Sequence, residues 1–268
     1  MSLGKTLRMK RIFDARSGTA LIVPMDHGIE GYFKELEDPR GLIRSIVDAG
    51  ANALLLRRGL AEFAAAEYAG KAGLIYRITS ASGLGRFTTE QPFISTVEEA
   101  VRIGADAVVA NLFVGSEREA ELLQRFGAIA EACDMWGMPF CAEMMPIGKK
   151  GSVPFDGPYS PDEVRIAVRV GAEEGADFIK TYYTGDVDSF REVVRYSTVP
   201  LIIAGGPPVK TDAEVLQMVR DAMDAGASGI AMGRKIWGAR DPPALTRALG
   251  RIIREKATVA EALEELKR

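Results

Sequence analysis

The sequence predicts an α/β fold, a single (β/α)8 TIM barrel that spans residues 1–268 as one domain and carries an extra helix at its C-terminus. Short apolar segments alternate with amphipathic helical segments, which is typical of parallel β/α units. The dipeptide Gly-Ala recurs at Gly50, Gly104, Gly175 and Gly226, each time before a strand-like segment. Each glycine falls where a helix must end and the chain must turn, which favours glycine. A length of 268 residues suits eight such units.

We expect strands at Ala20 to Met25, Ala53 to Leu56, Leu74 to Thr79, Ala107 to Phe113, Phe140 to Met145, Asp177 to Tyr182, Leu201 to Ala204 and Gly229 to Met232. We expect helices that include Pro39 to Ala49, Thr96 to Ile103, Ser116 to Trp136, Pro161 to Glu174, Asp186 to Tyr196 and Asp212 to Ala225. The spacing of apolar residues predicts a last helix over Thr258 to Arg268, either under the barrel or offered to another subunit. Met1, Ser2 and Leu3 are interpreted as an expression leader outside the fold.

An open doubly wound sheet is the alternative fold. No Gly-x-Gly-x-x-Gly motif follows the first strand, so the dinucleotide-binding version of that fold lacks its main signal.

Composition excludes several classes of function. A net charge of -3 gives no reason to expect a nucleic-acid partner, and the absence of a long apolar run or a basic leader predicts no membrane association and a cytoplasmic protein. Cys133 and Cys141 lie in apolar surroundings and are expected to be core thiols. His27 is the only histidine, so a multi-histidine metal site is excluded, and we expect neither a metal nor a cofactor.

Lys180 is the first candidate catalytic residue. It ends an apolar strand-like segment, and two tyrosines and a Thr-Gly-Asp turn follow it. An amine at the end of a buried strand is partly desolvated, which favours its neutral form and lets it attack a carbonyl. The functional interpretation is a lysine that forms a Schiff base, and the alternative is a strand-end lysine that reaches into solvent.

Glycines follow the last two predicted strands, at the barrel end where active sites gather. Gly205 and Gly206 come after the seventh strand, and Gly233 with Arg234 comes after the eighth. Backbone N–H groups, a helix N-terminus and one guanidinium together can hold a phosphate. The alternative is two tight turns and a solvated Arg234.

The motifs together resemble one family. Pro24-Met-Asp-His-Gly28, Arg58-Gly59, Gly175 to Asp186, Ala204-Gly-Gly206 and Met232-Gly-Arg234 occur in order over nearly the whole chain. They resemble the archaeal-type class I aldolases, which include fructose-bisphosphate aldolases and 2-amino-3,7-dideoxy-D-threo-hept-6-ulosonate synthases, and they look closer to the latter. The run from Lys180 to Tyr183 is also similar to the thiolase that degrades the phosphorylated autoinducer-2 signal.

The resemblance implies roles for residues at the predicted strand ends. Lys180 would form the imine, and Asp26 would assist proton transfer at the end of the first strand. The four residues assigned to phosphate binding are Gly205, Gly206, Gly233 and Arg234.

One position departs from the family. Both aldolase branches carry a proton-shuttling tyrosine before the proline of the fifth strand end, where this chain has Met145, and the family's arginine after that proline is Ile147. Because side chains alternate along a strand, Glu143 shares the face of Met145 and is a candidate replacement. Burial should raise the pKa of Glu143, whereas a charged Lys180 beside it would lower that pKa. Glu143 in a structural ion pair is the alternative, and Tyr182 is a second candidate donor that could instead cap the barrel mouth.

Two further features are given structural interpretations. His27 follows Asp26 and should point toward the barrel wall as a structural hydrogen-bonding residue. Lys149 and Lys150 are interpreted as a solvated basic loop, with a contact to a second phosphate or a carboxylate as the alternative.

The sequence therefore predicts a metal-independent Schiff-base aldolase or transaldolase, cytoplasmic and homo-oligomeric, with a phosphorylated keto sugar as its substrate. The alternatives are a thiolase acting on a phosphorylated diketone and a non-catalytic phospho-sugar binding protein.

Overall fold

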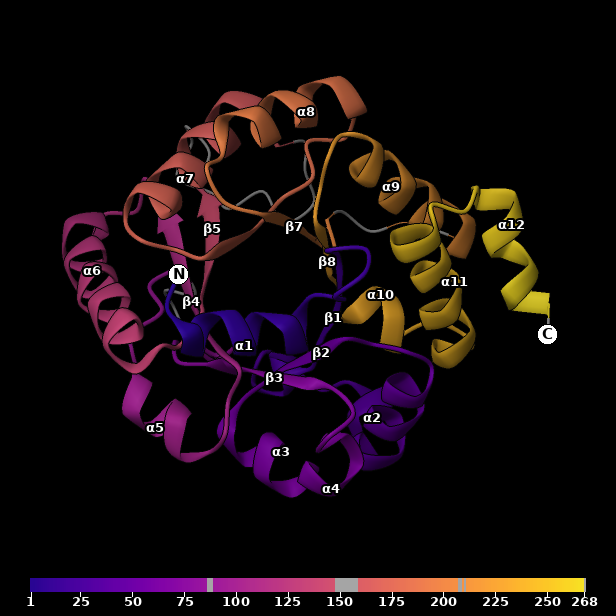
Figure 1. Ribbon diagram of the computed structural model, residues 1–268, viewed down its shortest axis with the longest axis horizontal. Helices are drawn as coiled ribbons and strands as arrows, with labels where there is room; N and C mark the ends of the chain where they lie inside the picture. The colour runs from indigo at the N-terminus through magenta and orange to yellow at the C-terminus, as the bar shows by residue number, and fades with distance from the viewer. Residues whose placement is uncertain (86–88, 148–158, 207–208, 210, 268) are drawn as a thin grey trace.

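Eight parallel strands form a closed barrel in the computed structural model, in the order β1 to β8, with helices around the outside (Figure 1). The structure describes residues 1–85, 89–147, 159–206, 209 and 211–267. The strands are β1 (Ala20–Pro24), β2 (Ala53–Leu56), β3 (Gly73–Arg77), β4 (Ala107–Val114), β5 (Phe140–Pro146), β6 (Phe178–Thr181), β7 (Leu201–Ala204) and β8 (Gly229–Ala231). The predicted fold class and all eight predicted strands are confirmed.

The helices include all six predicted segments, of which α5, α6 and α8 begin later than predicted. They are α1 (Leu3–Ile12), α2 (Pro39–Asp48), α3 (Arg58–Phe63), α4 (Ala65–Tyr68), α5 (Val97–Arg102), α6 (Glu119–Trp136), α7 (Pro161–Glu173), α8 (Val187–Tyr196), α9 (Asp212–Asp224), α10 (Arg234–Trp237), α11 (Pro242–Glu255) and α12 (Val259–Leu263), with short 3-10 turns at Asp26–Ile29, Lys34–Leu36 and Glu264–Lys267. Thr96 and Asp186, which we expected inside helices, instead cap α5 and α8 in extended conformations.

Apolar side chains fill the part of the barrel nearer the N-terminal ends of the strands. Residues that point inward from the eight strands form one cluster, which consists of Ala20, Ile22, Ala53, Leu55, Ile75, Ala107, Val109, Cys141, Phe178, Ile202 and Ala231 together with Ile12 from α1. Side chains alternate along a strand, so the next inward position toward the C-terminal end lies two residues further on. Those positions include Arg77, Asn111, Glu143 and Lys180. A polar layer therefore lies next to this apolar cluster, on the side of the C-terminal ends of the strands.

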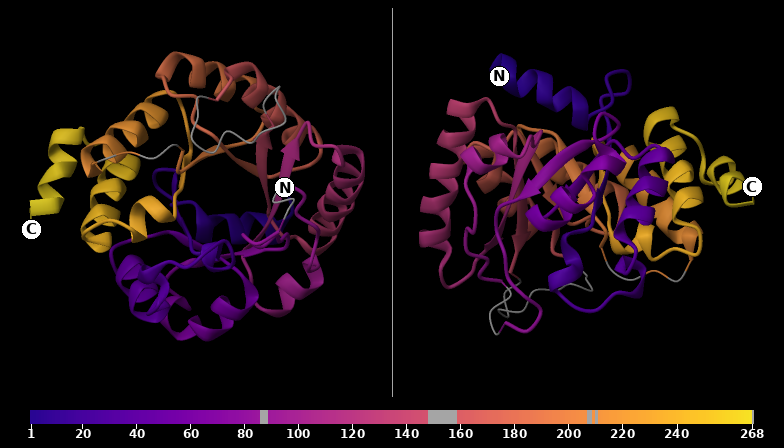
Figure 2. Two further views of the ribbon diagram at one scale, coloured as in Figure 1. Left: turned by 180° about the vertical axis from the view of Figure 1, so that it is seen from behind. Right: turned by 90° about the horizontal axis from the view of Figure 1, so that it is seen from below.

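The N-terminal helix α1 covers the opening of the barrel at the N-terminal ends of the strands (Figure 2). Phe13, the residue after α1, packs edge-on against Phe178 with 5.3 Å between ring centroids. Lys5 is buried and pairs with Asp134 at 2.5 Å and Asp177 at 2.8 Å. Ser2 caps α1 by accepting from the backbone N–H of Lys5. Ser2 and Leu3, interpreted from the sequence as lying outside the fold, are therefore the cap and the first residue of this helix.

The C-terminal segment packs on the outside of the barrel. Figure 1 shows α12 on the outer rim, and it contacts α9 and α11. Ala262 is fully buried in that contact, and the side chain of Glu265 is also buried. A last helix is confirmed, and its predicted alternative position under the barrel is wrong because α1 occupies that end.

Both cysteines are free, buried thiols, as the sequence predicts. Burial raises the pKa of each to about 12, so they stay protonated and unreactive near neutral pH. Across the described residues, no helix combines the length and apolar character needed to cross a membrane.

Candidate active site

A cavity of about 930 Å³ opens at the C-terminal end of the barrel. It lies above the apolar layer, where the strands end and the following loops begin. Every residue that the sequence singles out for catalysis or phosphate binding lines it, namely Asp26, Glu143, Lys180, Tyr182, Gly205, Gly206, Gly233 and Arg234. Parallel strands bring their C-terminal ends to one edge, which explains how positions more than 200 residues apart meet here.

Lys180 and Glu143 form a buried ion pair at the floor of the cavity. They face each other in the register of β5 and β6, and Lys180 Nζ lies 2.5 Å from Glu143 Oε1. The side chains are 7% and 10% exposed, so both charged groups are almost removed from water. The solvent-reaching lysine, the alternative interpretation, does not fit this position. The predicted inward direction of Glu143 is confirmed.

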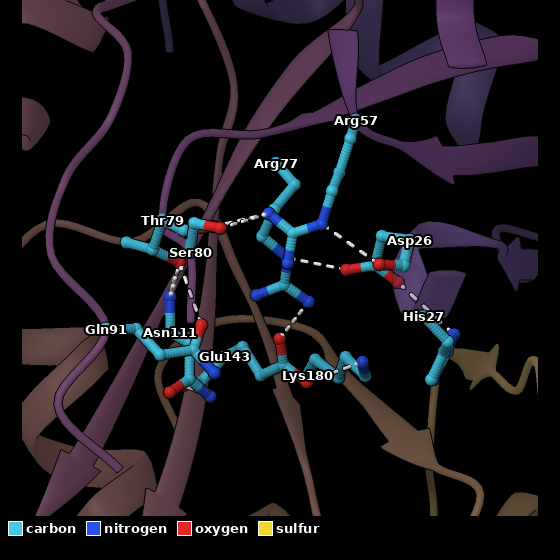
Figure 3. Close-up of polar contacts among 10 residues, drawn as sticks. All are labelled: Asp26, His27, Arg57, Arg77, Thr79, Ser80, Gln91, Asn111, Glu143 and Lys180. Carbon is cyan, nitrogen blue, oxygen red and sulfur yellow. Dashed lines mark hydrogen bonds and ion pairs between the residues drawn. The ribbon is translucent and has the colours of Figure 1, made fainter. Parts of the chain in front are cut away.

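Arg77 on β3 joins the two carboxylates and was not assigned any role from the sequence (Figure 3). Its Nε lies 2.8 Å from Asp26 Oδ2, and its Nη2 pairs closely with Glu143 Oε2. The Arg77 side chain is 6% exposed. The structural ion pair that the sequence left as an alternative for Glu143 therefore exists, but it includes Lys180 and lies within the cavity.

Asp26 begins the 3-10 turn after β1 and receives further support from the loops around it. Arg57 Nε donates to the Asp26 carbonyl oxygen at 2.9 Å, and Arg57 Nη1 donates to the Thr79 carbonyl oxygen at 3.0 Å. His27 Nδ1 lies 3.5 Å from Asp26 Oδ1, and the His27 ring packs against Trp237 with 5.8 Å between centroids. His27 also lines the cavity, so the prediction that it points toward the barrel wall is only partly right, and its Nδ1 has no hydrogen-bond partner among the described residues, contrary to its predicted hydrogen-bonding role.

Charge and burial oppose each other in this network. Burial alone would raise the pKa of Glu143, but the charges of Arg77 and then Lys180 outweigh it and lower that pKa. The same balance, with Arg77 as the main cation, lowers the pKa of Asp26. Burial lowers the pKa of His27 to about 4, so its imidazole is neutral near pH 7. The lowered pKa of Glu143 agrees with the expectation that a charged Lys180 counteracts burial there, and Arg77 adds a second cation that was not assigned a role from the sequence.

The network predicts a change in the pH dependence of stability when Arg77 is replaced. In the parent protein both carboxylates have lowered pKa values, so their contribution is complete above about 4.5 and is lost as the pH falls through the folded-state values. Arg77→Met removes the guanidinium that pairs with the buried Asp26 carboxylate, so the pKa of Asp26 should rise. We expect the variant to lose about 3–5 kcal/mol of unfolding free energy at pH 8 and to regain part of it at pH 5.

Urea denaturation at both pH values measures this change in unfolding free energy. Arg16→Met, at an exposed arginine outside the cavity, is the control and should leave the pH dependence unchanged. If the unfolding free energy of Arg77→Met is lower at pH 5 than at pH 8, Arg77 is not the main cation at Asp26.

Met145 and Tyr182 come two residues after Glu143 and Lys180, toward the C-terminal end of the barrel. Met145 is buried, lines the cavity and pairs in register with Phe113 of β4. The Tyr182 ring stacks on Tyr159, with 3.9 Å between centroids and an interplanar angle of 1°. Burial raises the pKa of the Tyr182 hydroxyl above its usual range. Stacking and a raised pKa suit a side chain that closes the barrel mouth better than one that shuttles protons.

The glycine-bearing ends of β7 and β8 lie side by side, as expected from their strand pairing. Gly206 has φ of +63°, a conformation that favours glycine, and a Cβ at Gly233 would overlap the Pro24 carbonyl oxygen. Gly233 precedes α10, so its neighbouring N–H groups belong to a helix start. Arg234 is exposed at the cavity rim. The prediction for Lys149 and Lys150 falls outside the described residues.

Comparisons with known proteins agree with this arrangement. Residues 20–239 match the DeoC/LacD family of aldolases. The 2-amino-3,7-dideoxy-D-threo-hept-6-ulosonate synthase of Halobacterium salinarum is 38% identical over 261 residues, which cover 97% of this chain and 95% of the relative. An uncharacterized aldolase of Saccharolobus solfataricus is 33% identical over 280 residues, which cover 99% of this chain and all of the relative.

Solved structures give the same result. An archaeal fructose 1,6-bisphosphate aldolase superposes with a TM-score of 0.83 at 31% identity, covering 94% of this chain and 99% of that one. A Schiff-base-forming fructose-1,6-bisphosphate aldolase superposes with a TM-score of 0.82 at 32% identity, covering 93% and 99%. The resemblance to archaeal-type class I aldolases that the motifs indicated is confirmed.

Proposed function

Because this chain belongs to the DeoC/LacD family of aldolases, we propose that it is a Schiff-base aldolase or transaldolase acting on a phosphorylated keto sugar. The observation that carries this proposal is the buried pair of Lys180 and Glu143, whose Nζ and Oε1 atoms lie 2.5 Å apart in the cavity floor. It supplies an amine and a group that can exchange protons with it in a site shielded from water. We do not propose the thiolase or the binding protein, because no feature of the described site favours either.

The reaction begins when the neutral amine of Lys180 attacks the carbonyl carbon of the substrate. Loss of water from the carbinolamine leaves a protonated imine. The hydroxyl on the carbon at the far end of the scissile bond then loses its proton, and the carbon-carbon bond breaks to release an aldehyde. The electrons of that bond move into the imine and form an enamine. Protonation of the enamine carbon and hydrolysis release the second product and restore Lys180.

Glu143 is placed to move protons in these steps. As a carboxylate it can accept a proton from the ammonium of Lys180, which makes the amine nucleophilic. It can return that proton when the carbinolamine hydroxyl leaves as water. Arg77 favours the carboxylate form, so Glu143 gives up its proton readily after accepting it. We assign the assisting role at the substrate hydroxyl to Asp26, which the same guanidinium holds as a carboxylate.

The phosphate is assigned to the ends of β7 and β8, next to Lys180 on β6. Gly205 and Gly206 allow close approach of backbone N–H groups, Gly233 opens α10, and Arg234 contributes a cation at the rim. A phosphate fixed there would place the adjacent ketone carbon over the neighbouring strand.

Borohydride trapping tests the proposal. Incubation of the protein with dihydroxyacetone phosphate and borohydride should add the mass of one reduced adduct to the chain. Absence of an adduct under conditions in which the protein is folded would refute imine formation with this ketone.

Replacement of Arg234 tests the phosphate assignment. Arg234→Ala should weaken the binding of phosphorylated ketones by about 10-fold or more, because a charge-assisted hydrogen bond contributes roughly 1.5–3 kcal/mol. Unphosphorylated dihydroxyacetone should be affected far less. The concentration of each ketone that gives half-maximal trapping measures the difference. Arg195→Ala, on the exposed face of α8, is the control. Equal losses for both ketones would remove the phosphate assignment.

Assembly and location remain predictions from the sequence. We propose a cytoplasmic homo-oligomer, because barrels of this kind often bury their outer helices between subunits. Light scattering from the purified protein measures the assembly.

A further inference from the structure

Asn111 carries a buried hydrogen-bond acceptor that the reaction described above does not use. It is 6% exposed on β4 and lines the cavity. Within the described part of the chain, its Oδ1 atom has no hydrogen-bond partner. A buried carbonyl oxygen without a partner costs free energy, so such atoms in a ligand cavity are typically paired with water or with a ligand.

The contacts of Asn111 fix which end of its amide is free. Asn111 Nδ2 donates to the Glu143 carbonyl oxygen at 3.4 Å, and that oxygen can only accept. The backbone N–H of Asn111 donates to Thr79 Oγ1 at 3.1 Å, and Thr79 Oγ1 in turn contacts Gln91 Oε1 at 3.4 Å. Figure 3 shows this group of side chains beside Glu143. The amide is therefore held with its oxygen available as an acceptor.

The strand order places this acceptor on the far side of the reacting lysine from the phosphate. Asn111 faces Glu143 in the register of β4 and β5, and Glu143 faces Lys180 in the register of β5 and β6. Two strand spacings separate Asn111 from Lys180, about 10 Å between their backbones. The proposed phosphate end lies over β7 and β8. A substrate chain that starts there and crosses Lys180 reaches Asn111 with its other half.

The charges around Asn111 select a neutral donor. Arg57 Nη1 lies 3.1 Å from Ser80 Oγ, beside Thr79, and Arg77 contacts Glu143 next to Asn111. Two guanidinium groups disfavour an ammonium group at this point, whereas a hydroxyl group donates to a carbonyl oxygen without adding charge.

We propose that Asn111, oriented by Thr79 and Glu143, forms a subsite for a hydroxyl group on the aldehyde half of the substrate. This inference rests on the proposed Schiff-base function. It specifies the aldehyde that the enzyme uses, which is a hydroxylated, sugar-type aldehyde and not a plain alkyl aldehyde. In the direction of synthesis, the enamine carbon on Lys180 bonds to the aldehyde carbon and the aldehyde oxygen takes a proton. Water then hydrolyses the product imine and frees the amine.

Aldehyde preference tests this subsite. Dihydroxyacetone phosphate consumption is followed with glyceraldehyde or with propanal, which has the same chain length and no hydroxyl groups. The parent protein should use glyceraldehyde at least about 10-fold more efficiently in kcat/KM, because a site built around a hydroxyl group leaves its own acceptor unpaired without one. Asn111→Leu, of similar shape, should lose most of that preference through a lower rate with glyceraldehyde and leave the rate with propanal nearly unchanged.

Borohydride trapping with dihydroxyacetone phosphate separates the two proposals, since this ketone does not reach the subsite. Trapping by Asn111→Leu equal to that of the parent shows a folded site with a working lysine. Asn111→Ala covers the case in which the leucine variant does not trap. Asn52→Leu, at an amide on the opposite end of the barrel that accepts from the backbone N–H of Leu21, is the matched control and should keep the preference. Normal trapping with an undiminished preference in both Asn111 variants overturns the subsite, whereas no trapping by the parent overturns the proposed function itself.

Discussion

Lys180→Met should abolish borohydride trapping with dihydroxyacetone phosphate and lower aldolase turnover below detection. Methionine keeps the length and approximate volume of the side chain and removes the amine, so no imine can form. The methionine also removes a cation from a buried network, but Arg77 still pairs with both Glu143 and Asp26. We therefore expect the fold to survive, with Glu143 still held as a carboxylate by the remaining guanidinium.

Peptide mapping makes the expected result specific to one residue. Lys235 also lines the cavity, so an adduct on Lys235 would change the assignment without removing Schiff-base chemistry. Digestion of the trapped parent protein should place the adduct on the peptide that contains Lys180. Lys71→Met, at an exposed lysine paired with Asp48, is the matched control and should trap normally. An unchanged adduct mass in Lys180→Met would exclude this lysine as the nucleophile.

The barrel and the position of Lys180 could be predicted from the sequence because both depend on local patterns. Apolar runs, capped helices and the Gly-Ala turns each act within a few residues, and eight repeats of one unit leave few ways to close a sheet. The face of Glu143 followed from the alternation of side chains along β5. These are properties that a single stretch of sequence carries by itself.

The partners of the site residues could not be predicted in the same way. Arg77 lies in an apolar segment correctly expected to be a strand, and a charged residue there was a signal that a buried partner was needed. Which carboxylates it joins depends on Asp26 in the turn after β1 and Glu143 on β5, which are far apart in sequence. For Glu143 the sequence indicated burial and a charged Lys180 as opposing influences on the pKa, but it did not reveal Arg77, which is the larger of the two charge contributions.

The N-terminal helix shows a different limit. From the sequence, the first three residues of the chain are placed outside the fold, and no helix is predicted after them. Lys5, two residues after them, holds this helix against the barrel by pairing with Asp134 and Asp177 from other elements. A pairing of this kind has no signature in the short segment that contributes the lysine.

Glu143→Gln should separate imine formation from turnover. The amide keeps the size of the side chain but cannot accept a proton from Lys180 or return one to the departing hydroxyl. Trapping needs only one imine per chain, so it should still reach completion in a long incubation even though imine formation is slower without the carboxylate beside Lys180. Turnover should fall by roughly 10²-fold or more, the usual effect of removing a general acid–base group. Single-turnover trapping and steady-state cleavage, measured on the same preparation, give the two rates.

The family tyrosine offers a rescue experiment for that variant. Met145 lines the cavity two residues after Glu143 on the same face of β5, at the position where the family resemblance implies a proton-shuttling tyrosine. Met145→Tyr in the Glu143→Gln background should restore part of the lost rate, because it returns a proton donor to the cavity. The same substitution in the parent protein should change the rate much less, since Glu143 already performs that step.

Tyr182 provides the test that can contradict this assignment. Its ring stacks on Tyr159 and burial raises the pKa of its hydroxyl, so we expect Tyr182→Phe to keep the stack and most of the turnover. If Tyr182→Phe loses turnover while Glu143→Gln retains it, the proton passes through the tyrosine, and the carboxylate beside Lys180 serves only to hold the amine in place. If both variants lose turnover but only Glu143→Gln is rescued by tyrosine at position 145, the carboxylate is the donor and Tyr182 positions the substrate at the barrel mouth.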